Sequence, residues 1–289
     1  MGEARKTKLD MNQSVYTNRI ALTVALGGFL MGFDASVISG VNKFVQIQFN
    51  LSDLQLGFSV SSLTIVAALA MMFSGPLSDK YGRKLVLKYC ALIFTVSAIG
   101  SALATGFTSF LIFRMLGGLG VGASLIVAPM YIAEIAPASK RGRLVSFNQL
   151  NIVLGITIAF FTNYYILSLA DHTSSWVSNY GIAEHNWRWM LGIEALPAIV
   201  YFFALFSVPK SPRWLMSKGN ENKATAVLQR FISVEETAEE IKAIKAALNN
   251  INSSRITPIT ELFKPAMRLV LTIGIVVSVL QQITGINAV

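Results

Sequence analysis

The sequence predicts an all-α membrane protein, and two observations lead to that fold class. Of its 289 residues, 53% are hydrophobic and 13% are charged, which is about half the charged fraction of a soluble domain. The hydrophobic residues gather in seven blocks, at about 20–40, 54–77, 85–105, 108–131, 144–167, 188–208 and 267–289. Blocks of this length match the ~20 residues with which a helix crosses a bilayer, and a helix satisfies its own backbone groups in lipid.

The basic residues predict how these blocks are oriented. Lys and Arg are concentrated in the N-terminal segment and in the connections 78–88, 132–143 and 209–266, whereas the connections on the other side carry only Lys43. Because Lys and Arg favour the cytoplasmic side, we expect a multi-pass protein of the cell membrane, plasma or inner, with a cytoplasmic N-terminus. Orientation accounts for the net charge of +9, so no nucleic-acid partner is expected; the partner is the lipid bilayer.

The blocks and connections divide the chain into four predicted parts. These are a cytoplasmic N-terminal segment (1–19), a six-span bundle (20–208), a cytoplasmic helical linker (209–266) and a seventh span (267–289). The N-terminal segment lacks the compact pattern of a cleavable signal, so the first block is expected to be a retained span. Within the linker, helices are predicted near 221–232 and 235–249, with an irregular linker as the alternative.

Two opposite charges lie inside the hydrophobic blocks. Asp34 lies six residues before Gly40, at the outer end of the first block, and Arg114 lies six residues after Thr108, at the outer start of the fourth. At 1.5 Å per residue, both are roughly 9 Å from the outer boundary. Since buried charges in a membrane need a partner, we predict a buried Asp34–Arg114 pair. Such a pair could load and release a proton, or it could be a static structural contact.

The glycine-rich stretch that follows Arg114 is interpreted as a packing surface. Gly118 and Gly122 form a small-xxx-small pair, which lets another helix approach closely, whereas the spacing of a dinucleotide-binding loop is absent. The sequence contains no cluster of metal ligands, and His172 and His185 lie in a predicted external loop. We therefore expect no enzyme, no metal and no cofactor.

Acidic and basic residues also occur together at the predicted cytoplasmic ends of the spans. Asp79 and Arg83 lie in the connection after the second block, and Glu134 and Arg141 lie in the connection after the fourth. Such residues are able to form ion pairs that hold helix ends together in one state of a moving protein. Flanking charges that only set orientation are the alternative, but they do not explain the two acids.

Five motifs in order resemble the sugar porter family of the major facilitator superfamily. They are DKYGRK at 79–84, L-x-G-L-x-x-G at 116–122 with the following Tyr131, Glu134 and Arg141, NWRWM at 186–190, PKSPRWL at 209–215 and QQITGIN at 281–287. The sequence is most similar to bacterial sugar–proton symporters of the xylose, hexose and inositol type. The resemblance covers nearly the whole chain.

The resemblance implies roles for individual residues. Asp34 matches the aspartate of proton-coupled members, and Arg114 matches its proposed partner. Four amides match residues that hydrogen-bond sugar hydroxyls: Gln149, Gln281, Gln282 and Asn287. A gating network on the cytoplasmic side would comprise Asp79, Arg83, Glu134, Arg141 and Arg213. Lys210 departs from the family, which has glutamate there. Trp187 and Trp189 are expected to anchor at the membrane interface.

The resemblance also implies a fold and a function. A complete member has twelve spans, so the chain would hold the N-terminal six-helix bundle, cytoplasmic helices and the seventh span only, and would lack the C-terminal half. The implied activity is alternating-access transport of a monosaccharide or related polyol, by sugar:proton symport with Asp34 and Arg114 as the coupling pair. The alternatives are a facilitative uniporter and a non-transporting sensor or truncated product.

Overall fold

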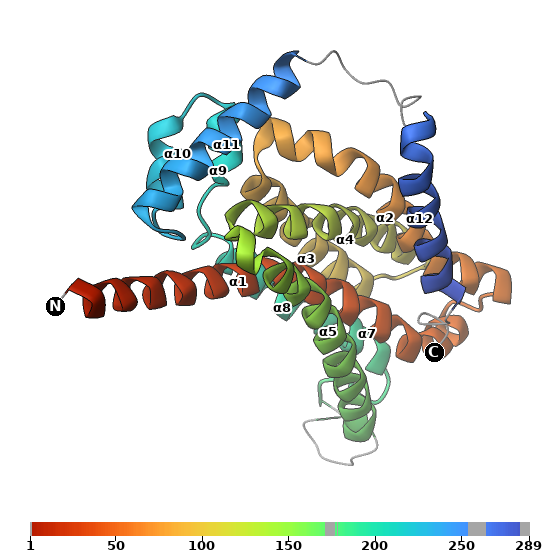
Figure 1. Cartoon of the computed structure of the whole chain (residues 1–289). Helices are drawn as coiled ribbons and strands as arrows, with labels where there is room; N and C mark the ends of the chain where they lie inside the picture. The colour runs from red at the N-terminus through yellow and green to blue at the C-terminus, as the bar shows by residue number, and fades with distance from the viewer. Residues whose placement is uncertain (1, 171–176, 178, 254–263, 284–289) are drawn as a thin grey trace. The chain divides into compact units, whose positions relative to one another are not determined.

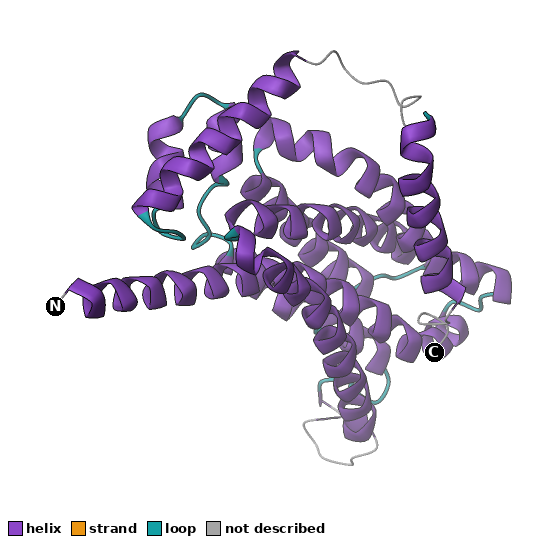
Figure 2. Cartoon of the chain, in the orientation of Figure 1, coloured by secondary structure: helices purple, strands orange, loops and turns teal. Residues whose placement is uncertain are grey.

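The chain is helical throughout the part that the structure describes. The computed structural model describes residues 2–170, 177, 179–253 and 264–283, which contain helices joined by loops and no strand (Figure 2). The predicted all-α fold is therefore confirmed. The helices are α1 (Gly2–Gln48), α2 (Asp53–Tyr81), α3 (Arg83–Ala102), α4 (Phe107–Ile135), the short 3-10 helix η1 (Ala138–Lys140), α5 (Arg141–Ala170), α7 (Asn186–Gly192), α8 (Ala195–Ala204), α9 (Pro212–Ser217), α10 (Glu221–Leu228), α11 (Val234–Ser253) and α12 (Pro265–Ile283) (Figure 1).

The chain forms two compact units, Met1–Ile241 and Lys242–Val289. The first contains the bundle and the short helices that follow it, and the second contains the rest of α11 together with α12. The boundaries predicted from the sequence, at 208 and 266, stay predictions.

Among the described residues of the first unit, five helices are long and apolar enough to cross a membrane. They coincide with the first five predicted blocks and cover 11–48, 53–81, 83–102, 107–135 and 138–170. The first helix is longer than its block, because the polar segment before residue 20 continues the same helix. In the second unit, Met267–Leu280 of α12 is a shorter apolar helix. It falls within the seventh predicted block.

The sixth block is a broken helix. Its two parts, α7 and α8, are separated at Ile193 and Glu194. Pro197 explains the break, because it has no N–H to donate to the carbonyl of Ile193 four residues earlier, and its ring would collide with that carbonyl. The chain turns more tightly instead, and Leu196 N donates to the Ile193 carbonyl at 3.1 Å.

Helix α4 is the centre of the packing. It lies against α1, α2, α3 and α5, while α1 also packs along α5. The two glycines predicted to face a neighbouring helix face α2. A Cβ atom on Gly118 would lie 2.4 Å from the carbonyl oxygen of Leu63, and one on Gly122 would lie 2.2 Å from that of Ala67. The predicted small-residue packing surface is confirmed, since only glycine permits this approach.

An aromatic cluster closes one end of the bundle. Trp187 is 2% exposed, and its ring meets Phe49 and Phe110 edge-on at centroid distances of 5.8 and 6.4 Å. The expectation that Trp187 anchors at the membrane surface is wrong, because its place in α7 turns the ring toward the bundle. Trp189, on the other side of the same turn, is 44% exposed.

The linker contains the predicted helices and one more. The short helix α9 begins at Pro212, with the Ser211 side chain capping it by accepting a hydrogen bond from Trp214 N. The predicted helices correspond to α10 and α11, with α10 shorter than expected and α11 continuing to Ser253. Gln13 of α1 donates to the carbonyls of Gln229 and Ile232, so the N-terminal part of α1 is fixed to these helices.

Candidate functional site

The predicted buried pair is present. Asp34 of α1 and Arg114 of α4 are each 3% exposed. Arg114 Nη1 donates to Asp34 Oδ1, and Nη2 donates to Oδ2 at 3.3 Å. The guanidinium thus binds both carboxylate oxygens, which is the strong geometry for such a pair. It joins two helices that pack against each other, so the contact predicted by counting residues agrees with the structure.

A second buried carboxylate, Glu194, lies beside this pair. It lies in the break between α7 and α8, is 2% exposed, and interacts electrostatically with both Asp34 and Arg114. Among the described residues, Glu194 Oε1 and Arg114 Nε have no hydrogen-bond partner. The sequence reasoning missed Glu194, although an acid within an otherwise apolar block, just before Pro197, was the signal that could have found it.

This buried cluster has an unbalanced formal charge. Two carboxylates and one guanidinium sum to one negative charge when all three groups are ionised. One added proton makes the cluster neutral, and burial penalises net charge strongly. The site is therefore suited chemically to holding and releasing a single proton.

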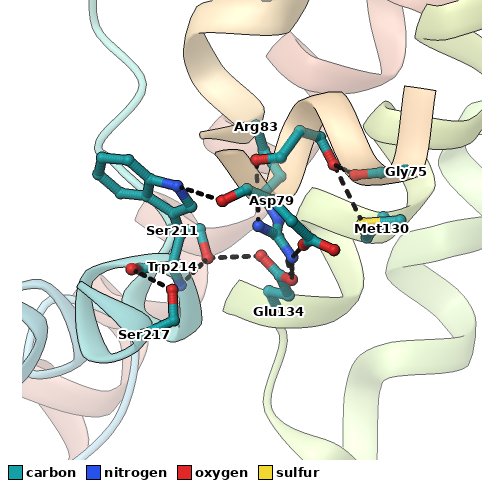
Figure 3. Close-up of polar contacts among 9 residues, drawn as sticks. Gly75, Asp79, Arg83, Met130, Glu134, Ser211, Trp214 and Ser217 are labelled. Carbon is teal, nitrogen blue, oxygen red and sulfur yellow. Dashed lines mark hydrogen bonds and ion pairs between the residues drawn. The ribbon is translucent and has the colours of Figure 1, made fainter. Parts of the chain in front are cut away.

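A second cluster joins the helix ends around Arg83 (Figure 3). Arg83 Nη2 lies 2.7 Å from Asp79 Oδ1 and 2.9 Å from Glu134 Oε1, and its Nη1 donates to the Ser78 carbonyl at 3.2 Å. The side chains of Arg83 and Glu134 are each 7% exposed, whereas that of Asp79 is 67% exposed. Arg83, the first residue of α3, therefore joins α3 to the end of α4 through a buried ion pair and also binds the end of α2.

The segment around α9 closes onto this cluster. The Ser211 hydroxyl donates to Glu134 Oε2, and Trp214 Nε1 donates to the Asp79 carbonyl at 3.1 Å (Figure 3). The Trp214 ring covers Gly82, whose φ of 93° is a conformation that side chains disfavour and whose Cβ position would lie 3.1 Å from that ring. Glycine is thus required at this turn by both backbone and space.

The other members of the predicted gating network lie outside these contacts. Arg213 interacts electrostatically with Glu134, but its side chain is exposed. Arg141 is also exposed, at the start of α5. The structure thus brings together Asp79, Arg83 and Glu134, and it adds Ser211 and Trp214 from the PKSPRWL segment.

The predicted sugar-binding amides are not assembled in the described residues. Gln149 is exposed on α5. Gln281 and Gln282 lie in α12 of the second unit, and their side chains are outside the described part, as is Asn287. Their roles stay predictions. Within the described ranges, no group of three His, Cys, Asp or Glu side chains is arranged to hold a metal ion.

The fold and these clusters define a class, which is a polytopic helical membrane protein with charged groups buried between its spans. Comparison with known proteins narrows the class. The family profile "Sugar (and other) transporter" matches residues 20–289. The chain therefore belongs to the sugar transporter family of the major facilitator superfamily.

Individual relatives agree with this assignment. The chain is 37% identical over 270 residues to the arabinose-proton symporter of Bacillus subtilis, covering 93% of this chain and 56% of that protein. It is 35% identical over 308 residues to the D-xylose-proton symporter of Escherichia coli, covering 96% and 59%. The relatives are transporters, so the prediction that the protein is not an enzyme agrees with them. The chain spans little more than half of their length.

A solved structure shows the same arrangement of helices. The partially occluded, inward-open form of the xylose transporter XylE from E. coli superposes with a TM-score of 0.79 and 33% identity, covering 94% of this chain and 65% of that one. The predicted major facilitator fold is confirmed by this match.

Proposed function

We propose that this chain is the N-terminal part of a sugar:proton symporter that works by alternating access. The observation that carries the proposal is the buried cluster of Asp34, Arg114 and Glu194. A protein that only lets sugar pass has no need of an ionisable cluster inside its bundle, whereas a symporter needs a group that is alternately protonated and ionised. The family and its proton-coupled relatives support the same conclusion.

In this proposal Asp34 carries the transported proton. A proton that enters from outside neutralises the Asp34 carboxylate and weakens its two hydrogen bonds from Arg114. The ionised Glu194 carboxylate then balances the positive charge of the Arg114 guanidinium. The cluster thus passes between a state with one negative charge and a neutral state, and sugar occupancy decides which one persists. Asp34 acts on coupling and does not touch the sugar.

The remaining predicted residues take their roles from the same proposal. The amides of Gln149, Gln281, Gln282 and Asn287 bind sugar hydroxyls, because an amide offers both a donor and an acceptor. The ion pairs of Arg83 with Asp79 and Glu134 close the cytoplasmic end of the spans, with the N-terminus on that side. Separation of α9 from α2 and α4 would break those contacts during opening.

The test is Asp34→Asn in the intact transporter that contains this chain, with Asp53→Asn as the matched control. Asp53 is an exposed aspartate at the start of α2 that accepts a hydrogen bond from Gln46. Asp34→Asn should abolish sugar accumulation against a gradient and the alkalinisation of the medium that accompanies uptake, while exchange of labelled sugar persists. Asp53→Asn should keep all three activities.

Two results would overturn the proposal. Accumulation by Asp34→Asn at the level of the unsubstituted protein would remove the coupling role. Uptake by the unsubstituted transporter without alkalinisation would indicate a uniporter with a static ion pair. The 289-residue chain alone is expected not to transport, since one bundle and one further span leave the sugar pathway open on one side. Sugar uptake into vesicles that contain only this chain would contradict that expectation.

A further inference from the structure

Three lysines lie together at the end of the spans where α2 passes into α3. Lys84 and Lys88 are one turn apart on α3, and Lys210 comes from the segment before α9. All three line one cavity of about 280 Å³, and electrostatic repulsion acts on Lys84 from both other ammonium groups. Like charges gathered in this way are unfavourable unless an anion lies among them.

The acids of this region do not supply that anion. Asp79 and Glu134 are ion-paired to Arg83, and among the described residues no ion pair involves any of the three lysines. Lys84 Nζ donates to the Phe206 carbonyl at 3.1 Å. The ammonium groups are held instead by uncharged neighbours.

Aromatic rings fix the other two ammonium groups near the apolar surface. Lys88 Nζ lies 3.2 Å from the ring centroid of Phe206, and Lys210 Nζ lies 5.2 Å from that of Trp214. Such contacts attract a cation without neutralising it. The three ammonium groups therefore lie together without an acidic partner, at the boundary where the spans end.

An apolar groove begins beside the lysine cavity. It has a volume of about 770 Å³, and Tyr81 and Leu85 line both spaces. Phe73 and Leu77 of α2 and Tyr89 of α3 form its walls, with exposed fractions of 69%, 46% and 57%. The floor is α4, which packs against both α2 and α3 while these two scarcely touch.

The dimensions of the groove fit a lipid chain. Its lining on α2 runs from Leu69 to Tyr81, a length of about 18 Å at 1.5 Å per residue. One leaflet of the hydrocarbon core is about 15 Å thick. The groove thus descends from the interface, where tyrosines are favoured, to about the middle of the bilayer.

We propose that this face of the bundle binds an anionic glycerophospholipid, with the headgroup phosphate among Lys84, Lys88 and Lys210 and one acyl chain in the groove between α2 and α3. Charge complementarity selects the anionic class, since three ammonium groups meet no acid there. Lys210 supplies the third of these ammonium groups. The bound lipid then compensates positive charges that no acidic side chain compensates among the described residues.

The experiment measures which lipid the chain retains. The 289-residue chain is reconstituted in a mixture of phosphatidylglycerol and phosphatidylcholine, extracted in mild detergent and analysed by native mass spectrometry. Phosphatidylglycerol should be retained preferentially. Lys210→Gln and Lys88→Gln should each lower that retention about fivefold, the effect of one lysine near an anionic surface. Lys223→Gln and Lys242→Gln, at exposed lysines of α10 and α11, should leave it unchanged.

A second substitution tests the acyl chain separately from the charge. Ala70→Trp fills the groove that Ala70 lines and keeps every lysine, so it should also lower phosphatidylglycerol retention. Circular dichroism and gel filtration exclude misfolding as the cause. The proposal would be overturned if the lysine variants retained as much phosphatidylglycerol as the unsubstituted chain. Displacement of the lipid by inorganic phosphate alone, together with no effect of Ala70→Trp, would also overturn it and would indicate a free-phosphate site.

Discussion

The two ion pairs of Arg83 should contribute very unequally to stability. The partner in one pair, Glu134, has a side chain that is 7% exposed, whereas in the other Asp79 is 67% exposed. Breaking a buried pair leaves an uncompensated charge and costs about 3–5 kcal/mol. Exposed i,i+4 pairs contribute about 0.3–0.5 kcal/mol. Glu134→Gln should therefore lower the free energy of unfolding by about 2–4 kcal/mol, which is less than the cost of leaving Arg83 with no partner because Arg83 still pairs with Asp79. Asp79→Asn should lower it by less than about 1 kcal/mol.

The measurement is thermal unfolding of the 289-residue chain in detergent. For a chain of this size, 1 kcal/mol corresponds to about 2–4 °C in Tm, so Glu134→Gln should lower Tm by roughly 4–16 °C and Asp79→Asn by at most a few degrees. A double-mutant cycle that combines Glu134→Gln with Arg83→Met measures the interaction free energy between Arg83 and Glu134. The reasoning is refuted if the two acid substitutions have equal effects, or if the coupling between Arg83 and Glu134 is below about 0.5 kcal/mol, the size of an exposed pair.

Two further predictions follow from the packing of the bundle. Gly122→Ala places a methyl group 2.2 Å from the Ala67 carbonyl and should lower Tm by several degrees, whereas Gly57→Ala, with nothing within 4 Å, should be neutral or stabilising by about 0.5–1 kcal/mol; equal Tm values for both variants would contradict the close approach. Pro197→Ala supplies an N–H four residues after the Ile193 carbonyl, which now accepts from Leu196 N, so amide hydrogen exchange should slow at the junction of α7 and α8; unchanged exchange there would show that Pro197 does not cause the break.

The contacts within the first four spans were predictable because simple periodicities govern them. Block length predicted the spans, and equal depth in the membrane predicted that Asp34 would meet Arg114. The spacing of Gly118 and Gly122 predicted a helix face without side chains. Each of these inferences needs only the regular rise and turn of a helix.

What the sequence reasoning missed depends on irregular backbone. Glu194 lies beside the buried pair at the tight turn between α7 and α8, and a regular helix through 188–208 gave no reason to place it there. Trp187 was assigned to the interface because aromatic residues often lie there, but rotation about the axis of the short helix α7 decides which way it faces. The contacts of Ser211 and Trp214 likewise depend on how the linker folds back.

Glu194 also changes what the buried pair is able to do. Asp34 and Arg114 alone form a neutral pair, so protonation of Asp34 would leave a buried positive charge with no partner, at a cost of several kcal/mol. With Glu194 beside them, the same proton takes the cluster from one negative charge to neutral, and the Glu194 carboxylate still interacts electrostatically with Arg114. A static pair would serve its structural purpose without the third group, whose own burial is costly. The presence of a second carboxylate at this position therefore favours proton exchange over a purely structural contact.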